Sequence, residues 1–362
     1  MRILVLMKRF GANKDMPVQD FGRQIRLFEN LTKEHKIDFL CADFRKFESK
    51  KISRNGIDYY IKPLSLFNFN GFSRKFKELV KFGNYDLIVA STSPIIGIIA
   101  YCYSKKYKIP MLYDLQDSFA AYDEYNIPSI SSIDRQIIKK SDLVICVSES
   151  LRKKISGFRK KPMYVIQNGI EKSLFKPIDR NSARKKLKLP LKSKIIVYIG
   201  HLEKLKGADI LLDSFSKVRK FYPDTYLLLS GKIEKGIDIK QKNIIFREFP
   251  KREDIVLAIN SADAAVIPNT PNEFSKYCFP YKLAEYMACK VPIVATDIGD
   301  VPLILKKYTG SLCRSDAYDM ATKIIGKLKS YKRVDYAKEL NNLDWKVLSG
   351  RLNKIIKTSI KK

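Results

Sequence analysis

Short apolar runs alternate with amphipathic stretches along most of the chain. This alternation is typical of βαβ units, in which helices connect the strands of a parallel sheet. The run from Leu87 to Ala90 is apolar throughout, as expected for a strand covered by helices on both faces. The first series of predicted strands comprises Arg2–Met7, Lys36–Leu40, Asp86–Ala90, Pro110–Tyr113, Leu143–Val147 and Met163–Ile166. The helical patterns between them include Gln19–Thr32, Ser73–Phe82 and Ile95–Lys105.

The same alternation starts again after a basic, proline-containing segment near residues 176–194. The second series of predicted strands comprises Lys194–Ile199, Thr225–Leu229, Asn243–Phe246, Ala264–Ile267 and Pro292–Ala295, with a helix over Ala208–Phe221. A chain of 362 residues is also too long for one typical hydrophobic core. We therefore expect an α/β protein with two Rossmann-like domains facing across a cleft, in residues 1–175 and 190–340. Apolar residues at helical spacing after Asp344 predict that residues 341–362 form a helix that packs back on the first domain.

The chain carries 69 lysines and arginines against 38 acidic residues, a formal net charge of +31. Such a charge favours an anionic partner, either a nucleic acid, a lipid surface or a phosphorylated substrate, or else indicates only a solvated basic surface. The basic residues are spread along the chain, whereas nucleic-acid binding favours a focused patch. We therefore expect no nucleic-acid partner.

No apolar run approaches the roughly 20 residues that span a bilayer. The first residues are too short for a signal peptide and read as a buried strand. The expected location is therefore the cytoplasm. A peripheral position on the inner face of the cell membrane is compatible with it. The six cysteines form no Cys-x-x-Cys pair, which favours free thiols over a zinc site or disulfides.

The loop from Tyr198 to Gly207 is the first candidate for chemistry. A predicted strand ends at Gly200, a helix begins near Gly207, and Lys206 precedes that helix. A helix N-terminus presents unpaired N–H groups to an anion, and a lysine beside it adds positive charge. An ordinary βα loop with a solvated lysine would look the same.

The second candidate is the helix that carries Lys282 and Glu285. Its neighbouring residues are apolar, and a carboxylate among them is costly unless something binds it. A ribose, with two adjacent hydroxyls, suits a carboxylate with two oxygens. The alternative is a surface ion pair between Lys282 and Glu285, one helical turn apart, which would contribute little energy.

These residues and their spacing resemble glycosyltransferase family 4, the retaining enzymes of the GT-B fold. The resemblance covers nearly the whole chain and is most specific at Lys282-Leu283-Ala284-Glu285-Tyr286-Met287-Ala288. Further matching segments are Tyr85–Ser91, Lys108–Pro110, Ser141–Ser148, Val165–Ile170, the loop from Gly200 to Gly207, and Val291–Pro302. The closing helix that begins at Asp344-Trp345 fits the family as well.

The resemblance implies a role for each matching residue. Glu285 corresponds to the ribose-binding glutamate, and Lys206 to the lysine that binds the donor diphosphate and stabilises its charge during transfer. Gly200, His201, Lys282 and Gly299 fall in the donor-binding segments. The implied reaction is hexosyl transfer from a nucleoside-diphosphate sugar to an acceptor hydroxyl, with retained anomeric configuration and without a metal. No Asp-x-Asp pair is present to hold a metal-diphosphate complex, and no other cofactor is expected.

The chain departs from the family pattern at three positions. His201 stands where the family often has an arginine. Tyr277 stands where a second glutamate is frequent, and Glu273 is the candidate substitute. Gln116-Asp117 replaces the usual His-Asp pair, so Gln116 can hydrogen-bond a sugar hydroxyl but cannot act as an acid. These departures leave open a degenerate transferase that binds the donor without turnover.

The stretch Leu66–Phe82 interleaves phenylalanines with basic residues. This pattern suits contact with an anionic membrane, which would fit a lipid-linked or cell-surface glycan precursor as the acceptor. An amphipathic helix whose phenylalanines pack in the core explains it equally well. Two further functions compete with the transferase, a nucleotide-sugar epimerase on the same scaffold and a basic nucleic-acid-binding protein.

Overall fold

The computed structural model describes residues 1–11, 14–65 and 69–360. The chain forms two compact units. Unit 1 comprises Met1–Gln167 together with Trp345–Lys362, and unit 2 comprises Asn168–Asp344. The first unit therefore ends earlier in the chain than residue 175, and the C-terminal residues return to it.

Unit 1 is built on an eight-stranded sheet with the order β10-β9-β8-β7-β1-β4-β6-β5. All neighbours pair in parallel except β5 and β6. Strands β4, β5 and β6 lie on one side of β1, and β7 to β10 lie on the other. The strand order therefore has its switch point between β1 and β7. The strands are β1 (Arg2–Lys8), β4 (Lys36–Asp43), β5 (Lys50–Arg54), β6 (Ile57–Pro63), β7 (Leu87–Ser91), β8 (Met111–Leu115), β9 (Leu143–Cys146) and β10 (Met163–Val165).

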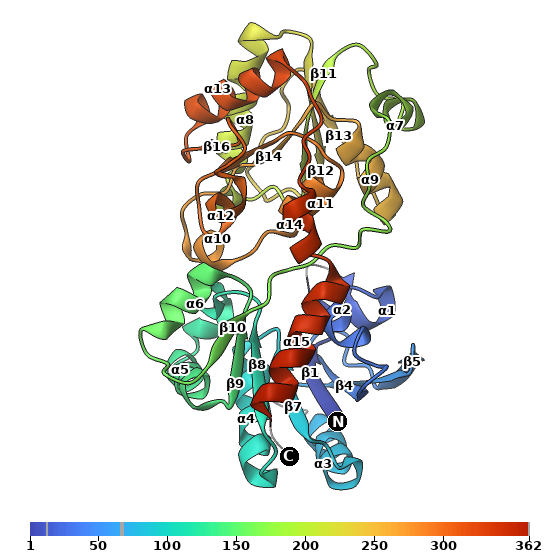
Figure 1. Ribbon diagram of the computed structural model, residues 1–362, viewed down its shortest axis with the longest axis vertical. Helices are drawn as coiled ribbons and strands as arrows, with labels where there is room; N and C mark the ends of the chain where they lie inside the picture. The colour runs from blue at the N-terminus through green and yellow to red at the C-terminus, as the bar shows by residue number, and fades with distance from the viewer. Residues whose placement is uncertain (12–13, 66–68, 361–362) are drawn as a thin grey trace. The chain divides into compact units, whose positions relative to one another are not determined.

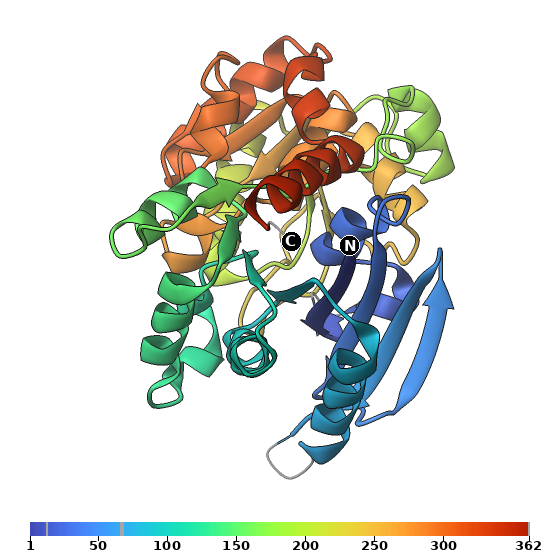
Figure 2. The same ribbon diagram turned by 60° about the horizontal axis from the view of Figure 1, so that its bottom comes forward.

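The β5–β6 hairpin at the edge of this sheet was missing from the sequence prediction (Figure 2). Its turn contains Asn55 at φ 52° and Gly56 at φ 76°. Two consecutive positive φ angles define a type I′ turn, for which Asn-Gly is a preferred dipeptide. A second, two-stranded pair joins β2 (Phe10–Gly11) to β3 (Lys14–Asp15).

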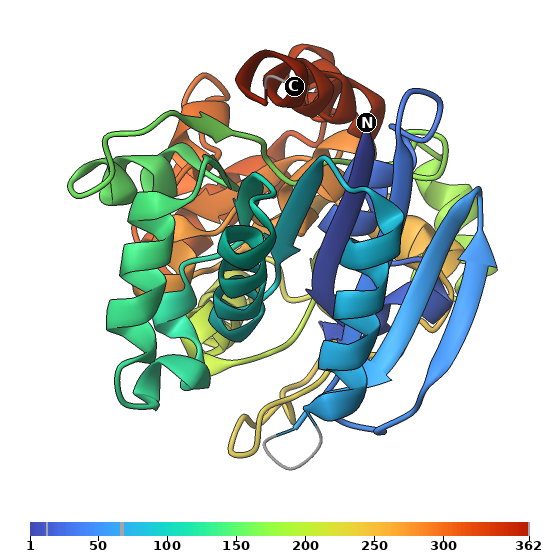
Figure 3. The same ribbon diagram turned by 90° about the horizontal axis from the view of Figure 1, so that it is seen from below.

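Helices cover both faces of the unit 1 sheet. In Figure 3, α15 (Trp345–Ser359) lies on one side of the strands and α3 (Asn70–Gly83) and α4 (Pro94–Tyr107) on the other. The predicted helix over residues 19–32 is shorter, because Asp20 adopts a left-handed conformation that separates α1 (Met16–Gln19) from α2 (Arg23–Glu29). Two further helices, α5 (Ile130–Lys140) and α6 (Glu149–Ser156), follow β8 and β9.

The predicted return of the C-terminal helix is confirmed. Helix α15 packs beside α2 (Figure 1). Its apolar side chains Leu348, Leu352 and Ile356 are fully buried in the same core as β1 and β4.

The phenylalanines in the middle of the predicted membrane-contact stretch belong to the core instead. Phe72 and Phe76 on α3 are fully buried, whereas Phe69 and Phe82 are exposed. Leu66 and Phe67, at the start of that stretch, lie outside the described residues. The core-packing interpretation therefore accounts for two of the four phenylalanines that the structure describes in this stretch.

Unit 2 is built on a six-stranded sheet with the order β13-β12-β11-β14-β15-β16, in which all neighbours are parallel. In chain order this is 3-2-1-4-5-6, the Rossmann arrangement, with its switch point between β11 and β14. The strands are β11 (Lys194–Ile199), β12 (Thr225–Ser230), β13 (Ile244–Phe246), β14 (Ala264–Ile267), β15 (Ile293–Thr296) and β16 (Leu312–Cys313). The two predicted Rossmann-like sheets are thus confirmed.

One face of this second sheet packs on α8 (Ala208–Phe221) and α13 (Ala317–Lys329) in a continuous apolar core. The remaining helices of unit 2 are α7 (Arg180–Lys186), α9 (Arg252–Asn260), α10 (Glu273–Tyr277), α11 (Tyr281–Ala288), α12 (Val301–Leu305) and α14 (Ala337–Asn342). Across the residues that the structure describes, no helix has the length and apolarity that crossing a membrane requires.

Candidate functional site

The carboxyl edge of the unit 2 sheet places the first candidate loop at the switch point. Strand β11 ends at Ile199, and the chain passes Gly200 before α8 begins at Ala208. Gly207 has φ 77°, and a Cβ atom there would lie 1.8 Å from the carbonyl oxygen of Pro268, the residue after β14. Only glycine fits this approach, which brings the start of α8 against the end of β14. The N–H groups of the first turn of α8 therefore lie at the switch point, where α/β proteins bind anions.

Lys206 and His201 share one carboxylate in this loop. Lys206 Nζ lies 2.9 Å from Glu203 Oε2, and His201 Nδ1 lies 3.0 Å from Glu203 Oε1. Burial opposes the charge of Glu203, but the hydrogen bonds from Lys206 and His201 outweigh it and lower the pKa of this carboxyl group. Glu203 thus holds Lys206, the predicted diphosphate-binding lysine, beside His201.

Helix α11 contacts the end of β11 through a hydrogen bond and a cation–π interaction. The backbone N–H of Ile199 donates to the hydroxyl of Tyr286 at 3.0 Å, and Lys282 Nζ lies 4.1 Å from the centre of the Tyr198 ring. A Cβ atom on Gly200 would lie 3.0 Å from Lys282 Nζ, so the absence of a side chain there leaves room for the lysine. The structure therefore brings Gly200 and Lys282 together at the end of β11.

Lys282 and Glu285 are half-buried charges without a direct counterion. Within the described residues, neither side chain has a hydrogen-bond or ion-pair partner. Burial lowers the pKa of Lys282 to about 8, and Glu285 partly offsets this effect. Burial likewise raises the pKa of Glu285, against the field of Arg252 and Lys282. The surface ion pair that was the alternative interpretation is absent, and both charges remain available for a ligand.

Arg252, at the start of α9, is a site residue that sequence reasoning missed. Its positive charge acts on Glu285, and its guanidinium donates to Glu171 Oε2 at 2.7 Å. No local motif marks it, because it approaches Glu285 only through the fold.

Helix α10 lies beside the lysine loop. The side-chain amide of Asn272, which caps α10, donates to the carbonyl oxygen of Leu205 at 2.6 Å. Lys206 Nζ lies 5.6 Å from the centre of the Phe274 ring. Glu273, the candidate second carboxylate, begins this helix and is half-buried. Glu273 therefore directly precedes Phe274, whose ring lies near Lys206.

Gly299 lies in the turn between β15 and α12 and packs against the other end of α10. It has φ 62°, and a Cβ atom there would lie 2.9 Å from the carbonyl oxygens of Ser275 and Lys276. Tyr277, at the position of the family's second glutamate, is half-buried on the same helix. Across residues 1–11, 14–65 and 69–360, no cluster of three or more metal-ligating side chains occurs.

Gln116 and Asp117 lie in unit 1, immediately after β8. Both are half-buried, and Asp117 Oδ2 accepts a hydrogen bond from the Tyr122 hydroxyl at 2.7 Å. Two residues before Gln116, Asp114 forms a fully buried ion pair with Arg23, which the sequence analysis also missed. Gln116 and Asp117 therefore follow a strand end that is firmly held.

A doubly wound sheet with Lys206 at its switch point, and with Lys282 and Glu285 on a helix attached to β11, has the arrangement of the nucleotide-binding class of α/β proteins. Residues 25–174 match the family described as Glycosyltransferase Family 4, and residues 193–330 match that described as Glycosyl transferases group 1. The chain belongs to glycosyltransferase family 4 and has the GT-B fold.

The curated relatives are distant and longer than the aligned region. D-inositol 3-phosphate glycosyltransferase of Mycobacterium leprae is 23% identical over 282 residues, which cover 71% of this chain and 63% of that protein. The corresponding protein of Mycobacterium marinum is 22% identical over 76% of this chain and 62% of its own length. The chain therefore spans less than two thirds of the length of these relatives.

Solved structures with the same fold cover almost all of the chain. Sucrose-phosphate synthase from Thermosynechococcus elongatus is similar with a TM-score of 0.77 and 17% identity, over 99% of this chain and 98% of the other. HepE from Anabaena in complex with UDP-glucose gives a TM-score of 0.72 and 18% identity, over 99% of this chain and 100% of the other. At these identities the similarity establishes the fold.

Proposed function

We propose that this protein is a retaining glycosyltransferase whose unit 2 binds a nucleoside-diphosphate sugar. The observation that carries the proposal is the pair of half-buried, unpartnered charges on α11, Lys282 and Glu285. An isolated buried charge is costly, so its retention favours a ligand that compensates it. One cation and one carboxylate beside a helix N-terminus match a diphosphate joined to a diol.

The donor's parts fit this arrangement in a defined order. The two ribose hydroxyls would donate to the carboxylate oxygens of Glu285. The diphosphate would accept from Lys206, from Lys282 and from the N–H groups of Asp209 and Ile210 in the first turn of α8, since the N–H of Ala208 already donates to the carbonyl oxygen of Glu203. HepE binds UDP-glucose on the same fold, and a UDP-hexose is therefore the first donor to test.

The reaction requires no strong base in this scheme. The bond between the sugar's anomeric carbon and the diphosphate breaks, and a bond to the acceptor oxygen forms on the same face. The acceptor's proton passes to the departing diphosphate oxygen. Lys206 and Lys282 would stabilise the negative charge that develops there, which is the principal contribution asked of the protein. Gln116 and Asp117 would bind hydroxyls of the transferred sugar or the acceptor.

We further propose that the acceptor is a lipid-linked or cell-surface glycan precursor bound by unit 1. The net charge of +31 favours an anionic acceptor or an anionic membrane carrying it. Exposed Phe69 and Phe82, with basic residues between them on α3, are the side chains available for such a surface.

A ligand screen tests the donor site. The midpoint of thermal unfolding is measured with UDP, GDP, ADP and their glucose conjugates. We expect one nucleotide series to raise it, and Glu285→Ala to abolish that shift. Asp213→Ala, which removes an exposed carboxylate on α8, is the matched control and should keep the shift.

Retention of the shift in Glu285→Ala, or no shift with any nucleotide, would refute the ribose assignment. Incubation of the donor with the protein alone separates the related activities. A transferase without acceptor yields at most slow hydrolysis, whereas an epimerised donor would indicate the epimerase.

A further inference from the structure

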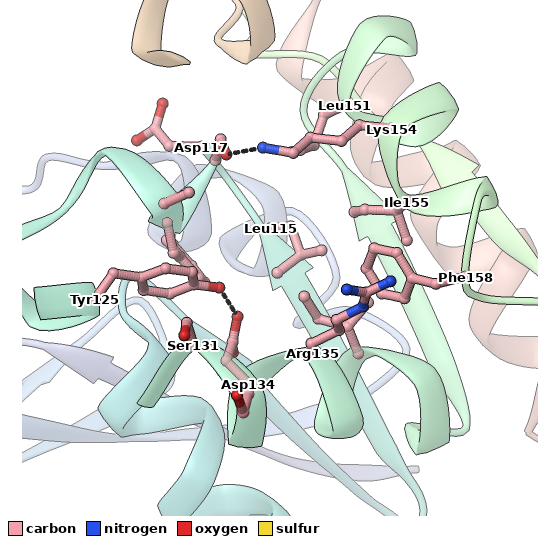
Figure 4. A pocket seen from close by; sticks show the side chains of 15 residues that line it. Leu115, Asp117, Tyr125, Ser131, Asp134, Arg135, Leu151, Lys154, Ile155 and Phe158 are labelled. Carbon is pink, nitrogen blue, oxygen red and sulfur yellow. Dashed lines mark hydrogen bonds between the residues drawn. The ribbon is translucent and has the colours of Figure 1, made fainter. Parts of the chain in front are cut away.

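A cavity of about 430 Å³ lies within unit 1, beside the end of β8. Helices α5 and α6 form its walls (Figure 4). Its volume is within the range of about 300–1,000 Å³ that is usual for small-molecule sites. Most of the lining is apolar and includes Leu115, Ile138, Leu151, Ile155 and Phe158. Asp117 is itself one of the lining residues, so a molecule in the cavity would reach the predicted catalytic segment.

Two cations lie at this largely apolar cavity. The guanidinium carbon of Arg135 lies 4.7 Å from the centre of the Phe158 ring, which supports the group from one side. Lys154 Nζ donates to Ser118 Oγ at 3.1 Å. In the described part of the chain, Arg135 has no carboxylate partner. Its guanidinium N–H groups are therefore available to an anion.

The acidic side chains of the cavity are already engaged. Both oxygens of the buried Asp134 accept hydrogen bonds, one from the Tyr113 hydroxyl at 2.6 Å and one from the Tyr125 hydroxyl. Figure 4 shows the Tyr125–Asp134 pair on the opposite side of Leu115 from Arg135 and Phe158. Burial raises the pKa of Asp134 despite these two hydrogen bonds. The carboxylate of Asp134 is thus satisfied by the two tyrosines, and Arg135 is the side chain whose N–H groups are available to a ligand.

We infer that this cavity binds the acceptor through a phosphate ester whose alkyl part lies on the apolar lining. The inference rests on the proposed transferase function and specifies its acceptor. Arg135 and Lys154 would hold the phosphate, for which a planar guanidinium is well suited. Both cations are exposed, so they would hold the phosphate at the solvent side of the cavity while the apolar lining receives the alkyl part. A neutral sugar or a hydrocarbon alone would engage neither charge.

Binding of simple probes to the full chain tests this inference by equilibrium dialysis. The probes are octyl phosphate, glucose 1-phosphate and octyl glucoside. The two octyl compounds are used below their critical micelle concentrations. We expect octyl phosphate to bind most tightly. Arg135→Gln should weaken it about tenfold, the usual effect of losing one charge-assisted contact. Lys139→Gln removes an exposed cation from the same helix outside the cavity lining and should change nothing.

The other outcomes overturn the inference. Equal binding of octyl glucoside would show that the phosphate is not recognised, and tighter binding of glucose 1-phosphate would assign the site to polar phosphates. Unchanged affinity in Arg135→Gln, or no binding of octyl phosphate, would remove the cavity as its site. The thermal shift by the nucleotide donor should be the same in Arg135→Gln and wild type, so failure here is distinguishable from failure of the donor site.

Discussion

Arg23 Nε lies 3.0 Å from Asp114 Oδ1, and both side chains are fully buried. The pair joins α2 to β8. Ser91 Oγ donates to Asp114 Oδ2 at 2.9 Å, and Arg23 Nη1 donates to the carbonyl oxygen of Gln167 at 2.8 Å. The ion pair and its two hydrogen bonds therefore link α2, β7, β8 and Gln167. Asp114 lies two residues before Gln116 in the chain.

Breaking this pair should destabilise unit 1. Asp114→Asn or Arg23→Met leaves an uncompensated buried group, and such changes cost about 3–5 kcal/mol. Trp345, the only tryptophan, lies in unit 1 and reports its unfolding by fluorescence in urea. The double variant Arg23→Met with Asp114→Asn should lose less than the sum of the two single losses. Strict additivity would show that the two side chains do not act as a pair.

The donor affinity should depend on pH through Lys282. Below its pKa of about 8 this lysine is charged in the free protein, and above that value it loses the proton that attracts a diphosphate. The terminal phosphate of UDP is already ionised in this range, since its pKa is about 6. We therefore expect the dissociation constant of UDP to rise between pH 8 and 10. In Lys282→Met, calorimetric titration should give weaker binding without this rise; a rise of the same size would exclude Lys282 as its source.

Removing Glu203 should strengthen diphosphate binding. Its carboxylate occupies His201 and Lys206, and a diphosphate must replace it as their partner. Partly exposed ion pairs are worth about 0.2–1 kcal/mol each, so Glu203→Gln should lower the dissociation constant of UDP about two- to fivefold. The contrary result, weaker binding, would mean that Glu203 holds His201 and Lys206 in their binding positions. Glu234→Gln nearby serves as the control, because its carboxylate accepts only from the backbone N–H of Lys204.

Helix α15 should contribute several kcal/mol to the stability of unit 1. Leu352 is fully buried between this helix and the sheet, and a Leu→Ala change in a core costs about 2–5 kcal/mol. Leu352→Ala should shift the fluorescence-detected urea transition to lower concentration. Lys354→Ala on the exposed side of the helix should leave it in place. A loss below 1 kcal/mol would mean that α15 is only loosely attached.

Most strands could be predicted because their apolar runs are long and continuous. Strand β11 and helix α8 agree with the sequence prediction at both ends, and β1 extends it by one residue. The β5–β6 hairpin was missed because its strands alternate polar and apolar residues at a sheet edge. Its Asn55-Gly56 turn was nevertheless a readable signal.

The candidate site was predictable where a motif is local and obscure where the fold assembles it. Lys206 and Glu285 follow from loop and helix patterns. The charge of Arg252 acts on Glu285 from a different helix, and Glu203 is recognisable as the shared partner of His201 and Lys206 only in three dimensions. The cavity between α5 and α6 had no sequence signal, because its lining residues come from separate elements that look like ordinary core positions.

The placement of α15 also constrains how the polypeptide matures on the ribosome. Residues 1–167 leave the ribosomal exit tunnel long before α15, the helix that covers one face of their sheet. Domains generally fold as they emerge from the ribosome, the N-terminal one first. Here unit 1 cannot complete its core until unit 2 and then α15 have been translated. The unsealed face, lined by β1 and β4, is therefore the surface that a nascent-chain chaperone would have to shield.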